Sequence, residues 1–277
     1  MKGSTETPKA PSQKGALIIV GGAEDREGKC LILREFVRLA GGTDAKIAVL
    51  TAATSAPREV GDMYTDIFKR LGVEHIEVVD TRAREDAEDR EMIQAIQGAT
   101  GIFFSGGDQA KIVESIKGTP LDAAIRERHE QGAVVGGTSA GAAMMPDTMI
   151  IEGDSTTNPR PEVVELGPGM GFLPGVVIDQ HFAQRGRLGR LLAALLLQPT
   201  MLGFGIDEDT AMVVQGQEFH VVGNGTITVI DESESSHNNV DHALKDEDLA
   251  VFGVKLHILP NGYRFNLNNR QPIAPGA

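Results

Sequence analysis

AVVGGTSAGAAMM, residues 133–145, runs from a short apolar segment into small residues that surround one serine, Ser139. The apolar segment predicts a buried strand, and the residues after the serine predict a helix. A Gly-x-Ser-x-Gly pattern in this context is typical of a nucleophile elbow, a strained turn that exposes the serine hydroxyl. The same residues also fit a plain turn in which Ser139 caps the helix.

Upstream of this stretch, short apolar runs alternate with segments of helical periodicity. The runs occupy residues 15–20, 46–51, 75–79 and 101–105, and the helical patterns occupy 27–39, 60–71, 86–96, 110–116 and 121–130. This alternation predicts an α/β fold, with a doubly wound, largely parallel sheet flanked by helices. Sites in such folds lie beyond the carboxyl ends of the strands, which is where GGAED, TAATS, SGGDQ and GGTSAG fall.

The C-terminal half is less regular and predicts short extra strands. We expect them at residues 176–179, 202–206, 211–214, 218–222 and 226–230, with an apolar helix at 188–197 and an acidic, mobile loop at 231–248. The last two strands predict a hairpin around Gly223-Asn224-Gly225. We expect one catalytic domain at residues 15–265, preceded by a disordered tail at 1–14 and followed by a C-terminal tail at 266–277.

Composition excludes several classes of function. The formal net charge of −13 argues against nucleic acid as a partner. No apolar run reaches the roughly 18 residues that cross a bilayer, and the first residues lack the apolar core of a secretory signal, so we expect a cytoplasmic protein. The single cysteine, Cys30, lies in a helical apolar pattern and is expected to fill the core. No His, Cys or Asp cluster has metal-ligand spacing, so we expect neither a metal nor another cofactor.

A serine nucleophile needs a base and an acid that orients the base. Among the seven histidines, His181 stands out because it directly follows a predicted strand end, in VVIDQHFAQRGR. The acid is expected among Asp207, Glu208 and Asp209, which follow the strand at 202–206. Side chains alternate along an extended segment, so Glu208 points to one face and Asp207 and Asp209 point to the other. The pattern does not decide which of the two faces meets His181.

Three motifs in this order, GGTSAGA, DQHFAQRGR and GIDEDTA, resemble the cyanophycinases, of the S51 serine peptidase family that also holds the aspartyl dipeptidases. IVGGAED, FFSGGDQ and TNPR resemble the same family, and the likeness covers residues 15–265. It implies a fold related to class I glutamine amidotransferases and a cytoplasmic homodimer. The implied reaction is the release of β-aspartyl-arginine dipeptides from cyanophycin, an aspartate polymer with an arginine on each β-carboxyl.

The resemblance also implies roles for individual residues. Ser139 is the nucleophile, His181 the base and Glu208 the orienting acid. The backbone amides that hold the oxyanion are those of Gly107, Asp108 and Ala140. The residues themselves add that Arg185, Arg187 and Arg190 cluster just after His181, and we expect at least one of them to bind a substrate carboxylate; a solvated basic face is the alternative. By the resemblance, acceptors for the substrate's own guanidinium come from Gln109, Asp179 and Gln180.

Three other functions remain open at this point. The first is an aspartyl dipeptidase that acts on small α-aspartyl peptides. The second is an α/β-hydrolase esterase, whose base would be a later histidine among His220, His237, His242 and His257. The third is a ligand-binding protein without catalysis, in which Ser139 would not react with a serine-directed phosphonate.

Overall fold

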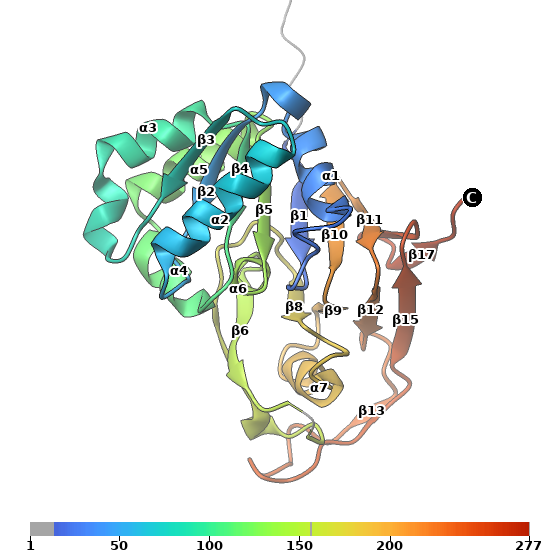
Figure 1. Ribbon diagram of the computed structural model, residues 1–277. Coiled ribbons are helices and arrows are strands. Elements are labelled where there is room, and N and C mark those ends of the chain that lie inside the picture. The colour runs from blue at the N-terminus through green and yellow to red at the C-terminus, as the bar shows by residue number, and fades with distance from the viewer. Residues whose placement is uncertain (1–13, 156, 277) are drawn as a thin grey trace, which may run out of the picture.

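The computed structural model describes residues 14–155 and 157–276, and its centre is a nine-stranded sheet (Figure 1). Five neighbouring strands of this sheet are parallel: β1 (Leu17–Val20), β5 (Val134–Thr138), β4 (Gly101–Phe104), β2 (Lys46–Leu50) and β3 (His75–Val79). Apolar runs such as LIIV and GIFF are fully buried because helices cover both faces. The α/β class predicted from the sequence is confirmed.

The helices divide between the two faces of the parallel strands. α1 (Leu31–Leu39) and α2 (Pro57–Arg70) pack with one set of strand residues, whereas α3 (Arg90–Gly98), α4 (Gln109–Ile116) and α5 (Pro120–Glu130) pack with the other. Ile18 joins the first cluster and Ile19 the second, as alternation along a strand requires. Cys30 lies buried in the first cluster, which confirms it as a core residue.

Antiparallel strands extend the nine-stranded sheet beyond β1. They are β10 (Thr210–Gln215), β11 (Glu218–Gly223), β16 (Arg264–Asn266) and β17 (Gln271–Ile273). β17 pairs with β16, so the sheet includes residues as far as Ile273. The expected C-terminal tail from residue 266 is therefore wrong, because residues 266–273 are continuous strand and turn. The expected N-terminal tail lies outside the described residues, apart from Lys14.

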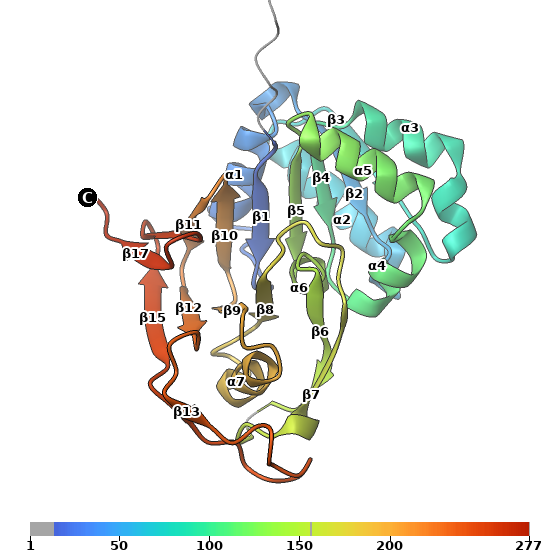
Figure 2. The same ribbon diagram turned by 180° about the vertical axis from the view of Figure 1, so that it is seen from behind.

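A second sheet of four strands lies behind the first and was not expected as a separate layer (Figures 1 and 2). Its strands are β15 (Lys255–Pro260), β12 (Thr226–Asp231), β9 (Leu202–Ile206) and β8 (Val176–Gln180). The predicted hairpin of β11 with β12 is wrong, since the two strands belong to different sheets. The chain crosses between the two sheets at Gly223, whose φ of 125° suits glycine. Asp207 holds the start of β12, because it accepts hydrogen bonds from the Thr226 amide and hydroxyl.

The remaining elements surround the carboxyl ends of the parallel strands. They are α6 (Ala140–Ala143), the antiparallel pair β6 (Thr148–Gly153) and β7 (Val164–Pro168), α7 (Leu188–Leu196), β13 (His237–Asn238) and β14 (Val251–Phe252). Short 3₁₀ turns occupy Gly42–Asp44, Arg84–Glu88 and Pro161–Val163. In both ribbon views the β6–β7 pair runs beside α7, against which β7 packs (Figures 1 and 2).

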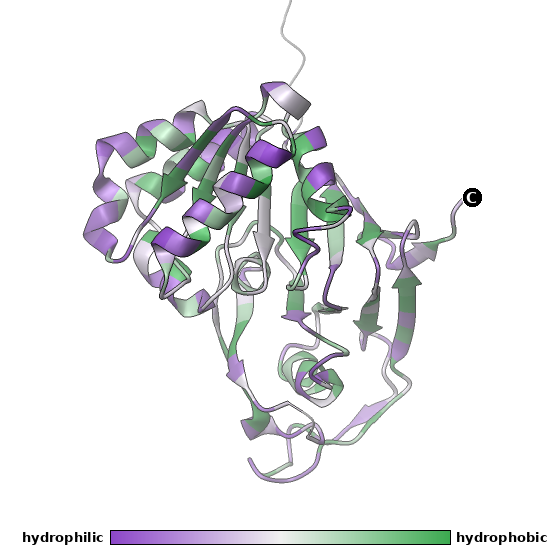
Figure 3. Ribbon diagram, in the orientation of Figure 1, coloured by the Kyte–Doolittle hydropathy of each residue, from purple (hydrophilic) through white to green (hydrophobic). Residues whose placement is uncertain are grey.

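Hydropathy separates the outer helices from the interior. The outer faces of α2 and α3 are hydrophilic, whereas the central strands and much of α7 are hydrophobic (Figure 3). α7 is the core of a third cluster that includes Leu191, Leu195 and Phe182. Throughout the part of the chain that the structure describes, no helix is both long and apolar enough to span a membrane.

Candidate active site

Ser139 occupies the turn between β5 and α6, as the nucleophile-elbow pattern predicts. Its backbone has φ 53° and ψ −109°, which confirms the expected strain, and its amide donates to the Val20 carbonyl at 3.0 Å. The side chain makes no capping hydrogen bond, so the plain helix-cap alternative loses its support. The strained turn therefore holds the hydroxyl away from the helix it precedes.

The hydroxyl meets a histidine and a carboxylate in one hydrogen-bonded chain. Ser139 Oγ lies 3.0 Å from His181 Nε2, and His181 Nδ1 lies 2.6 Å from Glu208 Oε1. With the ring proton on Nδ1, donated to Glu208, Nε2 is free to accept from the serine. Burial lowers the pKa of His181 and outweighs Glu208, which raises it, while the charge of Arg185 lowers it further. The imidazole is therefore neutral near pH 7 and can take a proton.

The structure distinguishes the three acidic residues that the sequence left open. Asp207 accepts from the Ala183 amide at 3.0 Å and from Thr226. Asp209 accepts from the Asp25 amide at 2.8 Å and from the Asn224 side chain. Only Glu208 of the three points its carboxylate at His181, because its neighbours hold the surrounding loops together.

The loop after β1, which the sequence placed at the site edge without a role for any of its residues, connects the segments of the catalytic chain. The Gly21 carbonyl accepts from the His181 amide at 2.8 Å, and the Gly22 carbonyl accepts from the Asp209 amide at 2.9 Å. Gly22 has φ 100°, and a Cβ there would overlap the His181 ring. The signal was available in the motif IVGGAED, whose glycines directly follow the first strand.

Glu24 in the same loop lies beneath the nucleophile elbow and is only 3% exposed. It accepts from the Thr138 hydroxyl at 2.5 Å, from the Tyr64 hydroxyl at 2.6 Å and from Arg26 at 2.9 Å. Burial raises the pKa of Tyr64 well above its ordinary value, so its hydroxyl stays a donor. Because Thr138 precedes the serine, this carboxylate anchors the turn that carries Ser139.

The predicted oxyanion donors divide into two groups. The amides of Gly107 and Ala140 make no hydrogen bond with any residue that the structure describes. The amide of Asp108 is not free, since it donates to the Ala53 carbonyl at 2.9 Å, and the Asp108 carboxylate caps α4. The prediction for Asp108 is therefore wrong, because its turn packs on the loop after β2.

Ser139 opens into a polar cleft of about 570 Å³, which we call the Ser139 cleft. Besides Ser139, Gly107, Ile151 and Gly153, its lining contains Gln109, Gln180, Arg185, Arg187, Arg190, Glu152, Asp154, Glu162 and Glu165. The volume is that of a site for a small molecule or one unit of a polymer. We call the three arginines the basic wall and the last four residues the acidic wall; the two adjoin, because Arg190 donates to the Gly153 carbonyl at 2.9 Å.

Asp179 does not line this cleft, and the prediction that it accepts a substrate guanidinium is wrong. It is 1% exposed and binds Arg190 through both carboxylate oxygens, while Arg187 lies 3.3 Å from Oδ1. One carboxylate is thus shared by two buried guanidiniums, and the group keeps a net positive charge. Burial, with repulsion from Arg190 and Arg185, lowers the pKa of Arg187 to about 10.

The other predicted substrate ligands differ in how many of their polar atoms are already hydrogen-bonded within the protein. Arg185 is exposed, and its guanidinium makes no hydrogen bond or ion pair within residues 14–155 and 157–276. Gln109 uses its amide nitrogen on the carbonyls of Ile150 and Ile151, at 2.9 and 2.5 Å. Gln180 is 8% exposed, and its Oε1 has no hydrogen-bond partner in the structure described.

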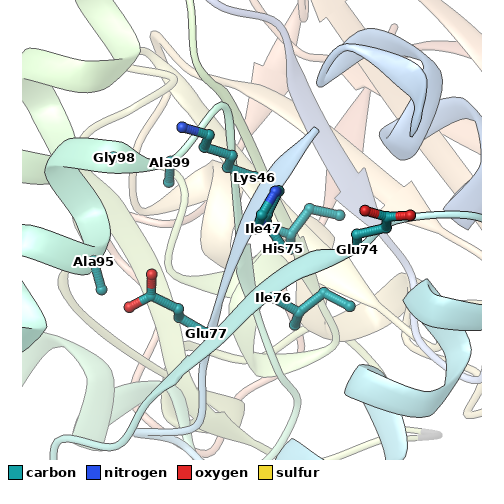
Figure 4. A pocket seen from close by; sticks show the side chains of 9 residues that line it. All are labelled: Lys46, Ile47, Glu74, His75, Ile76, Glu77, Ala95, Gly98 and Ala99. Carbon is teal, nitrogen blue, oxygen red and sulfur yellow. The ribbon is translucent and has the colours of Figure 1, made fainter. Parts of the chain in front are cut away.

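Another pocket, of about 320 Å³, lies at the amino ends of β2 and β3, whereas Ser139 follows the carboxyl end of β5 (Figure 4). Its lining includes Lys46, His75 and Glu77, and it contains none of the residues around Ser139. Among the described residues, no group of three or more His, Cys, Asp and Glu could hold a metal ion. The hydrogen-bonded chain of Ser139, His181 and Glu208, with two free amides beside the hydroxyl, is an arrangement that performs acyl transfer.

Comparisons with known proteins agree with this chemistry. The model of peptidase family S51 matches residues 17–222. A curated cyanophycinase from Geminocystis herdmanii is 41% identical over 263 residues, which cover 94% of this chain and 97% of the relative. A curated cyanophycinase from Synechococcus elongatus is 40% identical over 270 residues, which cover 97% of this chain and 84% of the relative.

A solved structure resembles the fold. The crystal structure of a peptidase from an acI-B1 Actinobacterium superposes with a TM-score of 0.68, covering 92% of this chain and 98% of that one. The two sequences are 21% identical, so the likeness supports the fold alone.

Proposed function

The chain belongs to peptidase family S51, and from that premise we propose that it is a serine peptidase that hydrolyses cyanophycin to β-aspartyl-arginine dipeptides. The observation that carries the proposal is the hydrogen-bonded chain from Ser139 through His181 to Glu208. The substrate follows from the curated relatives, two of which are about 40% identical over nearly the whole chain.

The proposed reaction begins when Ser139 Oγ attacks a backbone carbonyl carbon of the polymer. His181 Nε2 takes the hydroxyl proton, and Glu208 orients the ring and stabilises the imidazolium. The amides of Gly107 and Ala140 hold the oxyanion of the tetrahedral intermediate. Since α6 has only four residues, its dipole adds little, and these two amides supply most of the stabilisation.

Collapse of the intermediate releases the amine and leaves an ester on Ser139. His181 gives its proton to the departing nitrogen, so charge and atoms balance. A water then attacks the ester, with His181 as base, and hydrolysis frees the second product and the serine. The neutral imidazole that burial favours is the form that both steps require.

We assign the substrate carboxylate to Arg185. A β-aspartyl-arginine unit has a free α-carboxylate, and guanidinium groups bind carboxylates through two hydrogen bonds. Arg187 and Arg190 already share Asp179, whereas Arg185 lines the Ser139 cleft with its donors unused. Arg187 and Arg190 then act by keeping this side of the cleft positive.

The proposal includes a cytoplasmic homodimer, as the family resemblance implies. The one cysteine, Cys30, is buried and unpaired, which agrees with a reducing compartment. Light scattering on the purified protein tests the dimer, and a monomer mass would contradict it. Fractionation of cells that express the chain tests the compartment, and recovery outside the cytosol would contradict it.

The decisive experiment incubates the protein with insoluble cyanophycin and identifies the soluble products by mass. We expect β-aspartyl-arginine dipeptides from the wild type and none from Ser139→Ala. Cleavage of α-aspartyl dipeptides in place of the polymer would favour the dipeptidase function. A His181→Ala variant with normal esterase activity would favour a later histidine, and a Ser139 inert to phosphonates would favour a binding protein.

A further inference from the structure

The acidic wall of the Ser139 cleft makes no ion pair among the described residues, and the charge of Arg160 acts on Glu162 alone of its members. It consists of Glu152, Asp154, Glu162 and Glu165, which reach the cleft from β6, β7 and the segment between them. Within residues 14–155 and 157–276, none of these carboxylates has a hydrogen-bonded or ion-paired partner. The basic wall offsets only part of this charge, because the carboxylate of Asp179 balances one of its three guanidiniums and so leaves two positive charges beside the four carboxylates.

Two of the acidic residues face each other in the β6–β7 pair. Glu152 and Glu165 are directly opposite in the antiparallel register, next to an irregularity between Ile150 and Glu152. Like charges in this position repel and destabilise the strand pair. A cation that binds between the two carboxylates removes that repulsion.

Gln180 provides a separate sign of a missing ligand. It lines the same cleft from the end of β8, it is 8% exposed, and its Oε1 is buried without a hydrogen-bond donor. A buried acceptor without a partner costs about 1–3 kcal/mol relative to a bonded one. The cleft therefore offers a carboxamide oxygen and two carboxylates to a ligand that carries several N–H donors.

We propose that Glu152, Glu165 and the Oε1 of Gln180 form the subsite for the guanidinium of the substrate arginine. A guanidinium has five N–H donors in a planar fork, so it can bind two carboxylates and an amide oxygen together. An ammonium has only three donors, in a geometry that suits this set less well. The assignment rests on the proposed function and replaces Asp179, whose carboxylate the fold already uses.

This subsite gives the Ser139 cleft two binding groups of opposite charge. Arg185 takes the α-carboxylate of the arginine, and the acidic pair takes its guanidinium, with the scissile bond at Ser139. A ligand with only one of these charges leaves the other wall unpaired, which costs affinity. Specificity for a doubly charged β-aspartyl-arginine unit follows from the two walls together.

The test measures binding in a Ser139→Ala background, so that it does not depend on turnover. The probes are β-aspartyl-arginine and β-aspartyl-citrulline, whose ureido group has nearly the same shape without the charge. We expect the parent to prefer the arginine probe roughly 100-fold, and Glu152→Gln or Glu165→Gln to reduce the preference about ten-fold each. The double variant should bind both probes almost equally, and its affinity for the citrulline probe should match that of the parent.

The control variant is Glu77→Gln, the same chemical change on an exposed carboxylate in the pocket of Figure 4, which should leave both affinities unchanged. Thermal melts exclude misfolding, because loss of one of two facing like charges should not lower the melting temperature. A double variant that still discriminates the probes overturns the subsite, even if the wild type hydrolyses cyanophycin. Loss of discrimination supports the subsite, and failure of the wild type on cyanophycin then refutes the proposed function alone.

Discussion

The two regions that meet at Ser139 are built in opposite ways. Around the chain of Ser139, His181 and Glu208, backbone groups are bonded to one another through the loop of Gly21 to Asp25. In the Ser139 cleft, Arg185, Glu152 and Glu165 leave charged groups without partners in the described structure. The first region uses its interactions to hold reacting atoms in place, and the second keeps its interactions for a ligand.

This difference predicts two kinds of mutational effect. Changes in the bonded region should lower kcat, because they disturb geometry that both substrate and transition state depend on. Changes among the unpaired charges should raise KM, because they remove contacts that form only on binding. The following variants test this division, from the largest expected effect to the smallest.

Removal of a reacting group gives the largest effect. Ser139→Ala and His181→Ala should each lower kcat on cyanophycin by roughly 10⁴- to 10⁶-fold, with KM and the melting temperature nearly unchanged. Glu208→Gln should cost less, about 10³-fold, since Glu208 orients the base and does not react. The double variant of Ser139→Ala and His181→Ala should have a kcat little lower than that of either single variant. Steady-state kinetics and thermal melts check this, and a fully active His181→Ala protein would refute the triad.

Gly22→Ala tests whether the loop holds the base. The added methyl would overlap the His181 ring, so the ring must move from Ser139, and we expect kcat to fall about 100-fold. Gly42→Ala is the matched control, because Gly42 also has a positive φ, 68°, but its methyl would meet nothing within 4 Å. Both changes should cost about 1–2 kcal/mol of stability from backbone strain. Equal activity of the two variants would show that the loop does not position the base.

Glu24→Gln tests the support beneath the elbow. A carboxamide cannot accept from both Thr138 and Tyr64 through two oxygens, so one buried hydroxyl loses its acceptor. We expect a loss of about 2–3 kcal/mol in the free energy of unfolding and a roughly ten-fold lower kcat. Glu24 acts as a positioning residue, and KM should stay near the wild-type value. A Glu24→Gln variant with raised KM and normal kcat would show that Glu24 acts in substrate binding, and would contradict the division between the two regions.

Substitutions of Arg185 are expected to give the smallest change in kcat. Comparison of a lysine with a glutamine at this position separates the effect of the charge from that of the two-pronged contact. Arg185→Lys keeps the charge but loses the two-pronged contact with a carboxylate, so KM should rise about ten-fold. Arg185→Gln removes the charge as well. Since that charge lowers the pKa of His181, its loss should raise the pKa and move the acidic limb of kcat/KM to higher pH. Profiles of kcat/KM against pH check this, and a limb shifted equally in both variants would contradict it.

Much of the fold could be predicted from local patterns. Apolar runs of four to six residues and helical periodicity located all five parallel strands and the helices between them, because both signals depend on neighbouring residues. The elbow at Ser139 was visible for the same reason, since a tight turn requires small residues beside it. The hairpin of β11 and β12 was predicted from turn residues that in fact carry the chain between two sheets.

The site was predictable to the extent that it depends on position along a strand. His181 could be identified because it follows a strand end, but the face of Glu208 was left open until the resemblance suggested it. Asp108 and Asp179 were assigned to substrate chemistry, whereas the structure bonds one to Ala53 and the other to Arg187 and Arg190. The partner of Asp108 lies 55 residues away, and the two arginines that bind Asp179 reach it only because the chain turns back between β8 and α7.

By itself, the sequence determined the α/β class, the strained serine turn and the histidine beside it, since each follows from residue type and short-range spacing. The tertiary structure alone decided which charged groups are bonded within the fold and which are left for a ligand. Asp179 and Glu165 are equally acidic in the sequence, and only packing buries the first between two arginines and leaves the second facing Glu152. The physical reason is that the state of a charge depends on its burial and on its neighbours in space, which the packing of distant segments creates.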